Sequence, residues 1–451
     1  MNSPSGYKKF GRPVWDKLWR AAGLAWLVVS GDVLPLRAEN WPQWRGPRAD
    51  GIASDSNPPQ RWDLQTAVAW RTALPGQGGA TPVVWDERIF LTSAEGSDLV
   101  AICLSAIDGK VLWKRQVTSG NQDARAGEGN SASASPSTDG RFVWVFFSNG
   151  ILACLDAKDG AERWKLDVGD QFGRLDIQFG MTSTPVLDGE ALYLQLLHGP
   201  MVRGNSQRTG KVVKLDKLSG KTLWAVDRLT EAEFECKHSY ASPFIYRDGQ
   251  QEFLLVHGAD CTTGHALEDG RELWRLDQLN GPTSLNPKAN DATFRFVASP
   301  GMVPGTIIVP TAKEGPTICL DSSQVLRGKL AGTAAVRWVF PKTPDVSIPL
   351  VVDHYVYLLH KDGKLQCLDL QSGKEHYLER THTSQHRASP LYANGYLYLC
   401  SREGVTTIVR AGQKFEMVAQ NDLQESLTAS PLIANGTLYL RTYEALYAIR
   451  R

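Results

Sequence analysis

The sequence predicts an all-β fold, an eight-bladed β-propeller of four-stranded antiparallel blades, and three observations lead to it. A short phrase of a small residue, then Ser or Thr, then Pro occurs eight times, with Ile in the middle position of one copy, and short apolar strands follow it each time. The recurring prolines lie 41 to 58 residues apart, which is the size of a propeller blade. In nearly every repeat an aromatic residue stands four positions after a turn that ends in glycine. The eight phrases are Ala80-Thr81-Pro82, Ala134-Ser135-Pro136, Ser183-Thr184-Pro185, Ala241-Ser242-Pro243, Ala298-Ser299-Pro300, Ser347-Ile348-Pro349, Ala388-Ser389-Pro390 and Ala429-Ser430-Pro431.

Residues 1–38 have the pattern of a secretory signal peptide. A basic stretch precedes the apolar run from Ala21 to Val29, which is too short to span a bilayer comfortably. Cleavage is expected after Ala38, and an uncleaved anchor is the alternative. The mature protein is therefore expected to be periplasmic or secreted, without a stable membrane span.

Residues 39–61 are expected to form an N-terminal strap, and residues 62–451 the propeller. Trp41 and Trp44 lie close to the new N-terminus, and two large apolar side chains there need a surface to cover them. A strap or lid lying across the propeller explains both of them. The alternative is that they stack on a ligand.

The first strand of the propeller completes the last blade. Residues 67–71 match only the outermost strand of a repeat, whereas the final repeat reaches Arg451 after three strands. Pairing the two segments closes the ring and removes two open sheet edges.

The aromatic residue at the end of each repeat is expected to pack as a plate between adjacent blades. Rings at one fixed place in different blades lie too far apart to form a single cofactor site, so their role is structural. They are Trp70, Trp113, Trp164, Trp224, Trp274, Trp338, Tyr377 and Phe415.

The cysteines follow the repeat rather than a disulfide framework. Cys103, Cys154, Cys319 and Cys367 occupy one equivalent position and are expected to be small buried apolar side chains. A bridge between Cys236 and Cys261 in the fourth repeat is left open.

The balance of charge points to no nucleic-acid partner and no anionic membrane surface. Lys and Arg number 49 and Asp and Glu 48, a net charge of +1. The sequence also contains no phosphate-binding loop, no nucleophile elbow and no zinc-protease pair. His257 and His265 form the nearest thing to a polar cluster, and a structural role is favoured for them over metal binding.

The residues just before each Ser/Thr-Pro phrase are expected to ring the mouth of the central channel. Within this ring, His238, Arg295 and Arg387 are the candidates to hold a small polar or anionic ligand. The alternative is a solvated rim without a ligand. The ring comprises Gln77, Ser131, His238, Arg295, Asp345, His386 and Arg387.

The run from Leu155 to Trp164 and its counterparts resembles the PQQ-type β-propeller repeat. That repeat is found in quinoprotein dehydrogenases and in the outer-membrane protein-assembly lipoprotein, so it serves both enzymes and scaffolds. The Trp41–Pro47 opening, with Thr263-Gly264-His265, looks like the exported single-propeller proteins of planctomycete-type bacteria.

The resemblance implies two readings of function. Quinoprotein dehydrogenases stack the quinone between a tryptophan and a disulfide of adjacent cysteines, beside a calcium ion, and many pass electrons to a haem. This sequence has no adjacent cysteine pair and no Cys-x-x-Cys-His. The favoured reading is an exported non-catalytic scaffold that binds a protein or polysaccharide at the cell envelope, with no catalytic residue, metal or cofactor assigned. The alternative is a PQQ-dependent dehydrogenase of an alcohol or sugar, with PQQ and calcium. Function is expected in the segments that the repeats do not share, 170–180, 199–209 and 322–335.

Overall fold

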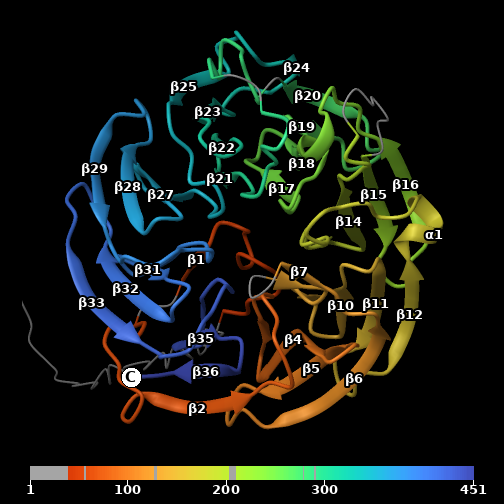
Figure 1. The fold of residues 1–451 in the computed structure, drawn as a ribbon, viewed down its shortest axis with the longest axis vertical. Coiled ribbons are helices and arrows are strands. Elements are labelled where there is room, and N and C mark those ends of the chain that lie inside the picture. The colour runs from red at the N-terminus through yellow and green to blue at the C-terminus, as the bar shows by residue number, and fades with distance from the viewer. Residues whose placement is uncertain (1–38, 55–56, 126–128, 203–209, 278, 289–290) are drawn as a thin grey trace, which may run out of the picture. The chain divides into compact units, whose positions relative to one another are not determined.

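The computed structural model describes residues 39–54, 57–125, 129–202, 210–277, 279–288 and 291–451. The predicted signal peptide, residues 1–38, and residues 203–209 of one variable segment lie outside the described residues. The described residues from Val68 onward build an all-β ring of eight four-stranded antiparallel blades, the predicted eight-bladed propeller (Figure 1). The described helices are the short α1 (Val168–Phe172) and one 3-10 turn, Phe234–Lys237.

The blades are numbered in the order of their innermost strands, and each runs from the channel outward. Blades 1 and 2 consist of β3 (Val83–Trp85), β4 (Arg88–Glu95), β5 (Asp98–Ser105) and β6 (Val111–Ser119), and of β9 (Ser137–Thr138), β10 (Phe142–Phe146), β11 (Ile151–Asp156) and β12 (Glu162–Asp167). Blades 3 and 4 consist of β13 (Val186–Asp188), β14 (Ala191–Leu196), β15 (Lys211–Asp216) and β16 (Thr222–Asp227), and of β17 (Phe244–Arg247), β18 (Glu252–Gly258), β19 (Cys261–His265) and β20 (Glu272–Leu276).

The second half of the ring repeats the same order. Blades 5 and 6 consist of β21 (Gly301–Val303), β22 (Thr306–Pro310), β23 (Thr317–Asp321) and β25 (Val336–Phe340), and of β26 (Leu350–Val352), β27 (Tyr355–Leu359), β28 (Lys364–Asp369) and β29 (Glu375–Arg380). Blades 7 and 8 consist of β30 (Leu391–Ala393), β31 (Tyr396–Cys400), β32 (Val405–Arg410) and β33 (Met417–Asp422), and of β34 (Leu432–Ala434), β35 (Thr437–Arg441), β36 (Ala445–Ile449) and β2 (Val68–Ala73).

Blade 8 confirms the predicted closure of the ring. Strand β2 pairs antiparallel with β36, from Val68 opposite Ile449 to Ala73 opposite Ala445. The first and last strands of the propeller therefore share one sheet, and the red and dark blue ends of the chain meet there in Figure 1.

A belt of hydrogen bonds joins the innermost strands around the channel. The hydroxyl of the Ser or Thr in one phrase accepts the backbone N–H of the same position in the preceding blade, as Ser242 Oγ does from Thr184 N at 2.8 Å. Ile348 carries no hydroxyl, so the junction of blades 5 and 6 lacks this bond. The phrase thus joins neighbouring blades at seven of the eight junctions, a role that we did not predict from the sequence. The other six bonds run from Thr81 to Ser135, Ser135 to Thr184, Ser242 to Ser299, Ile348 to Ser389, Ser389 to Ser430 and Ser430 to Thr81.

Seven of the eight predicted aromatic plates hold one equivalent register position in the outermost strands. The prediction for Phe415 is wrong, because Ala419 holds that position in blade 7 and the Phe415 ring packs on Tyr377 with centroids 5.6 Å apart. Trp113 is 5% exposed, and its indole N–H donates to the Ala157 carbonyl of blade 2 at 3.1 Å. The turn glycine of blade 2, Gly160, lies flat on this ring with φ of +74°, and a Cβ there would stand 2.8 Å from the indole. Glycine is needed because the turn is left-handed and the ring leaves no room for a side chain.

The junction between blades 4 and 5 departs from this pattern. Blade 5 carries the 322–335 insertion in place of the usual turn, and β24 (Gly328–Lys329) from it pairs parallel with the outer strand β20. Trp274 is 1% exposed, yet its indole N–H has no hydrogen-bond partner among the described residues. The insertion thus covers an outer edge of blade 4 but removes the carbonyl to which the other five tryptophan plates donate.

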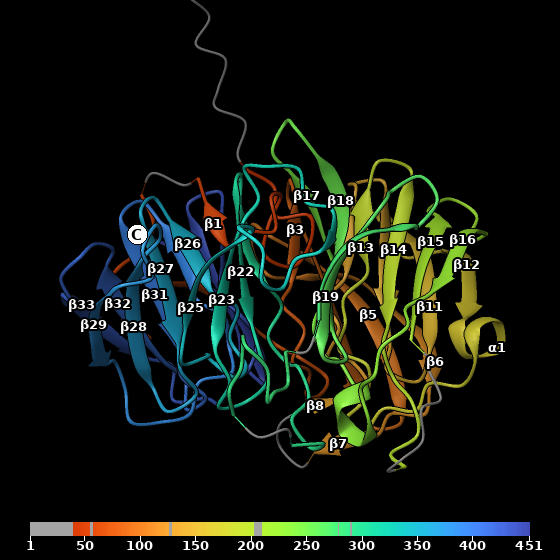
Figure 2. The same cartoon turned by 90° about the horizontal axis from the view of Figure 1, so that it is seen from above.

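Residues 41–53 form a strap across one face of the propeller. Trp41 exchanges two backbone hydrogen bonds with Val84 of blade 1, and β1 (Ile52–Ala53) pairs parallel with β30 of blade 7. Between them the fully buried Arg45 guanidinium donates to the Pro390 carbonyl at 2.6 Å. Figure 2 shows β1 at one face and the small hairpin of β7 (Asp123–Arg125) and β8 (Gly129–Asn130) at the other.

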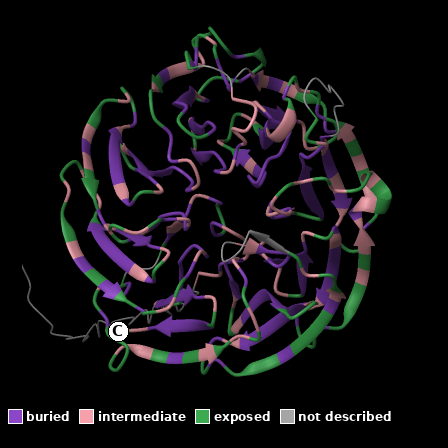
Figure 3. Ribbon diagram, viewed as in Figure 1, coloured by how far each residue is buried: buried purple, intermediate pink, exposed green. Residues whose placement is uncertain are grey.

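Burial follows the distance from the perimeter (Figure 3). Middle strands such as β10 are buried at every residue, whereas outermost strands such as β6 alternate with solvent. All seven cysteines are buried free thiols, so Cys236 and Cys261 are not bridged. In the part of the chain that the structure describes, no helix is long and apolar enough to cross a membrane.

Candidate functional site

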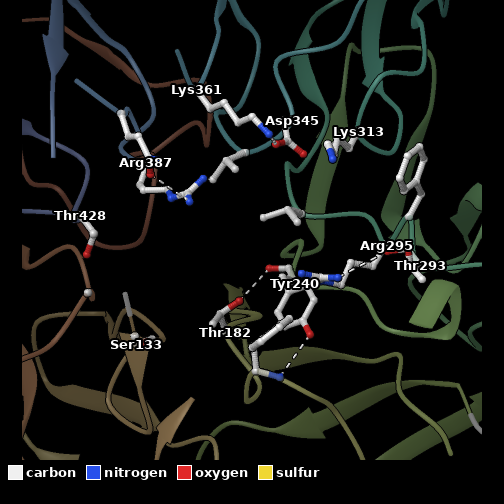
Figure 4. A pocket seen from close by; sticks show the side chains of 17 residues that line it. Ser133, Thr182, Tyr240, Thr293, Arg295, Lys313, Asp345, Lys361, Arg387 and Thr428 are labelled. Atoms are coloured by element: carbon white, nitrogen blue, oxygen red, sulfur yellow. Dashed lines mark hydrogen bonds and ion pairs between the residues drawn. The ribbon is translucent and has the colours of Figure 1, made fainter. Parts of the chain in front are cut away.

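One cavity lies at the mouth of the central channel (Figure 4). It has a volume of about 610 Å³, and we call it the mouth pocket. Connections into the innermost strands supply most of its lining, and turns between the second and third strands supply Lys313 and Lys361. Both kinds of connection lie at the same end of an antiparallel blade. The polar and aromatic lining residues are Ser133, Phe179, Thr182, Tyr240, Thr293, Phe294, Arg295, Lys313, Asp345, Lys361, Gln385, Arg387 and Thr428.

Arg295 is held rigidly at the wall of the mouth pocket. Its guanidinium forms an ion pair with Glu235, and its Cζ lies 4.5 Å from the centre of the Phe179 ring. Tyr240 lies beside Phe179 with ring centroids 6.2 Å apart, and burial raises the pKa of its hydroxyl to about 12. A guanidinium fixed by a carboxylate and an aromatic face needs little further ordering to bind an anion.

The remaining charges give the mouth pocket an excess of cations. Lys361 Nζ lies 3.0 Å from Asp345 Oδ2, whereas Lys313 reaches over the Phe294 ring at 5.5 Å. Arg387 lines another part of the pocket, where it donates to Oε1 of its neighbour Gln385 at 3.3 Å. Four cationic side chains therefore face a cavity whose lining holds one carboxylate, Asp345.

The structure places the predicted ring residues in different surroundings, and Gln77 is exposed and lines neither cavity. Arg295, Asp345 and Arg387 line the mouth pocket, and Ser131 lines a neighbouring cavity. His238 and His386 are fully buried instead, and burial lowers the pKa of both imidazoles, to about 4 for His386. His238 thus faces the protein interior and does not reach the pocket directly.

His238 holds the wall of the pocket rather than the ligand space. Its Nε2–H donates to the Gly199 carbonyl at 2.8 Å, so Nδ1 accepts, and it receives the Gln178 N–H at 3.4 Å. His198 Nδ1 accepts the Asp176 N–H at 3.2 Å, and the Tyr240 hydroxyl accepts the Phe179 N–H at 3.3 Å. Three side chains from other segments therefore fix residues 174–180, which we call the wall segment.

A second cavity of about 520 Å³ lies on the other side of the wall segment, and we call it the side cavity. Its lining is mostly polar or glycine, with Leu175 and Ile177 as the aliphatic side chains. The lining residues are Gly120, Gln122, Asn130, Ser131, Ser148, Asn149, Asp167, Gly169, Asp170, Arg174, Leu175, Ile177, Gln178 and Gly180.

The polar cluster of the fourth repeat is closed to both cavities. His257 Nδ1 lies 2.7 Å from Thr262 Oγ1, and His265 Nδ1 lies 2.8 Å from the Gly270 carbonyl. Burial lowers the pKa of His257 to about 3 and that of His265 to about 4, so both rings are neutral at pH 7. These contacts are those of buried structural histidines.

Sequence reasoning did not name Lys313, Lys361 or Tyr240, whereas Phe179 lies in the segment 170–180, where function was expected. The predicted ring held only residues that precede the innermost strands, so it left out both lysines. The turns between second and third strands meet the same face, and this geometric signal would have found the two lysines.

Comparison with known proteins gives a family match over most of the propeller. A family model described as outer membrane protein assembly factor BamB matches residues 61–199 and 208–451. Solved structures that share the fold include the following two. BamB from Moraxella catarrhalis has a TM-score of 0.58 at 14% identity, covering 82% of this chain and 94% of that chain. Europium-containing methanol dehydrogenase has a TM-score of 0.66 at 11% identity, covering 92% and 98%.

Similar curated proteins include both an assembly factor and dehydrogenases. Polyvinylalcohol dehydrogenase of Pseudomonas sp is 29% identical over 52% of this chain and 35% of that protein. Quinohemoprotein alcohol dehydrogenase ADH-IIG of Pseudomonas putida is 29% identical over 36% of this chain and 21% of that protein. Outer membrane protein assembly factor BamB of Moranella endobia (strain PCIT) is 24% identical over 58% and 60%. The chain spans about a third or less of the length of these dehydrogenases.

The residues of the mouth pocket do not match the quinone and calcium site that the resemblance implies. Calcium takes about six to eight oxygen ligands, often several carboxylates. Among the described residues no group of three or more His, Cys, Asp or Glu side chains could hold a metal ion, and Asp345 is tied to Lys361. The aromatic lining is phenylalanine and tyrosine, so the tryptophan platform is also missing from it.

Proposed function

The chain belongs to the family of the outer membrane protein assembly factor BamB, and we propose that it is an exported, non-catalytic propeller that binds a partner at the cell envelope. The partner is a protein or a polysaccharide, and the mouth pocket recognises an anionic group on it. The observation that supports this proposal is the convergence of four cationic side chains on a cavity lined by one carboxylate.

The physical basis is a preformed, charged site on a rigid ring. Guanidinium groups bind carboxylate and phosphate-like oxygens with two parallel hydrogen bonds, and lysine adds a point charge. The belt of hydrogen bonds around the channel holds the innermost strands in place. The connections that carry these groups therefore begin at fixed positions. An anion entering the mouth pocket is therefore met by groups already in place.

The test compares a pocket variant with a matched surface variant. We expect sulfate and galacturonate to raise the melting temperature of the wild type at low ionic strength. The double substitution Lys313→Gln, Arg387→Gln should abolish this rise, whereas Lys158→Gln, Lys374→Gln on exposed turns should keep it. Equal anion responses of the two double variants would refute anion recognition in the mouth pocket.

The second candidate is a PQQ-dependent dehydrogenase of an alcohol or sugar, which the similarity to quinoprotein dehydrogenases favours. When bound, PQQ would accept the electrons of an alcohol, with calcium as its electrostatic partner. Purified protein incubated with PQQ and calcium separates the two proposals. Quinone absorbance that survives desalting, together with dye reduction by an alcohol, would overturn the non-catalytic function.

A further inference from the structure

We propose that the mouth pocket and the side cavity are neighbouring subsites for one acidic polysaccharide chain. The mouth pocket takes a carboxylate or sulfate of the chain, and the side cavity takes the hydroxyl groups of an adjoining sugar. This inference rests on the proposed function and specifies its ligand.

The two cavities share their walls. Gly129 lines the mouth pocket, and the next two residues, Asn130 and Ser131, line the side cavity. On the wall segment, Phe179 lines the mouth pocket, and its neighbours Gln178 and Gly180 line the side cavity. An extended ligand can therefore contact both cavities by passing over a single short segment.

The side cavity offers polar groups that the fold itself does not use. The side chains of Gln122, Asp170, Arg174 and Gln178 make no hydrogen bond or ion pair with any other described residue. By contrast, Asp167 accepts the Gly169 N–H at 2.8 Å, and Asn149 donates to the Ser119 carbonyl at 3.0 Å. The four unused groups are the ones available to a ligand.

Their chemistry matches a ligand rich in hydroxyl groups. An amide both donates and accepts, a carboxylate only accepts and a guanidinium only donates. Sugar hydroxyls both donate and accept, so they satisfy all three kinds of group in one cavity. The volume of about 520 Å³ lies in the range of sites for small ligands.

The mouth pocket supplies what an acidic sugar requires in addition. Lys313, Arg295 and Arg387 attract its negative charge, and the rings of Phe179 and Phe294 offer apolar surface to the C–H faces of a sugar. Lys313 and Arg387 enter the cavity from different blades, so anionic groups of the chain meet a cation on either side of it.

Both subsites exist before the ligand arrives, because the wall segment is fixed from behind. His198, His238 and the Tyr240 hydroxyl accept the backbone N–H groups of Asp176, Gln178 and Phe179 respectively. Ordering a loop on binding lowers affinity, and this segment is already ordered. The geometry therefore suits a stiff chain with repeating polar groups.

An acidic peptide is the competing ligand, and the side cavity argues against it. Many protein and peptide interfaces take much of their binding energy from apolar or aromatic anchors in dry pockets. The side cavity presents Leu175 and Ile177 as aliphatic groups among amides, carboxylates and hydroxyls. A hydroxyl-rich chain makes better use of this lining.

The experiment measures affinity by calorimetry as a function of chain length. The probes are galacturonate, tetragalacturonate, a sulfated galactan tetrasaccharide, neutral galactotetraose and hexaglutamate, each against the wild-type protein. The variants are Gln122→Ala, Gln178→Ala for the side cavity and Lys313→Gln, Arg387→Gln for the mouth pocket. Lys158→Gln, Lys374→Gln is the control, and melting curves verify that each variant is folded.

We expect at least one acidic tetrasaccharide to bind at least tenfold more tightly than both the galacturonate monomer and neutral galactotetraose. The side-cavity variant should lose about tenfold for that tetrasaccharide and leave monomer binding unchanged, since each lost hydrogen bond contributes a few-fold. The mouth variant should weaken both acidic saccharides. The preferred tetrasaccharide identifies uronate or sulfate as the anionic group.

Three results would overturn the inference. They are equal affinity for monomer and tetramer, no effect of the side-cavity variant, and hexaglutamate binding as tightly as the tetrasaccharides. In each case the mouth variant still tests the proposed function separately. If it binds the monomer or the peptide more weakly than the wild type does, anion recognition in the mouth pocket stands although the polysaccharide inference fails. If no acidic probe binds at all, both are refuted.

Discussion

Replacing Ser242 by alanine tests whether the hydroxyl belt around the channel stabilises the ring. The substitution removes the Ser242 hydroxyl, to which the Thr184 N–H donates at 2.8 Å in the native ring. Thr184 and Ser242 are 4% and 2% exposed, so water is not well placed to replace the lost bond. A buried unsatisfied N–H costs about 1–3 kcal/mol, and we expect the free energy of unfolding to fall by that amount.

Two comparisons sharpen this expectation. Ser242→Thr keeps the hydroxyl and should cost less than about 0.5 kcal/mol, because Thr81 and Thr184 already serve as acceptors in the belt. Ser97→Ala removes an exposed hydroxyl and serves as the control. The natural gap at Ile348 shows that the ring accommodates one missing bond, where an apolar side chain is buried instead.

The assay is equilibrium unfolding in urea combined with hydrogen exchange. We expect the midpoint of Ser242→Ala to fall at an unchanged dependence on urea, and the Thr184 amide to exchange faster than in the wild type. If Ser242→Ala is no less stable than Ser97→Ala and the Thr184 amide stays protected, the belt does not contribute to stability and the reasoning is wrong.

Three further predictions concern the blade junctions and the buried histidines. Trp338→Phe should lower the free energy of unfolding by about 1 kcal/mol more than Trp274→Phe does. The reason is that the Trp338 indole donates to the Leu370 carbonyl at 2.9 Å, whereas the Trp274 indole N–H has no described partner. Equal urea midpoints of the two variants would contradict this prediction. Gly160→Ala should lower the free energy of unfolding by at least about 1–2 kcal/mol, because φ is +74° and the added methyl group meets Trp113. If the variant melts at the same temperature as the wild type, this packing is wrong. The third prediction is a loss of stability below pH 6.5. Burial lowers the pKa of four histidines from an unfolded value of about 6.5 to between about 3 and 4, so the unfolded state binds more protons in that window and stability falls as the pH drops. Burial raises the pKa of Asp260 to about 7, so this one group stabilises the folded state as the pH falls. We expect the four histidines to outweigh it. A urea midpoint that rises from pH 7 to pH 5 would contradict this.

The sequence was sufficient to predict the ring, because each of its parts is repeated. The phrase around Ser135 and the plate at Trp164 recur at blade spacing, and the unmatched strand near Trp70 could belong only to the last blade. The structure agrees, down to the pairing of β2 with β36. Local patterns suffice where one geometry is used again and again.

The site was only partly predictable, because side-chain direction in a connection depends on contacts with other blades. Arg295 and His238 stand at matching places before their strands, yet Arg295 faces the pocket and His238 faces inward to the Gly199 carbonyl. The ring that Arg295 covers, Phe179, comes from a segment without a counterpart in the other repeats. No repeat pattern states which of these directions a side chain takes.

The sheet of blade 8 also determines the order in which the propeller can be completed. Strand β2 is synthesised before any other part of the ring, and its neighbour β36 is synthesised last. Until β36 appears, seven blades can form while β2 has no place in a sheet and the open ring exposes strand edges. The ring therefore closes only when β36 is complete and pairs with β2. Before that point, the exposed strand edges of two nascent chains can pair with each other.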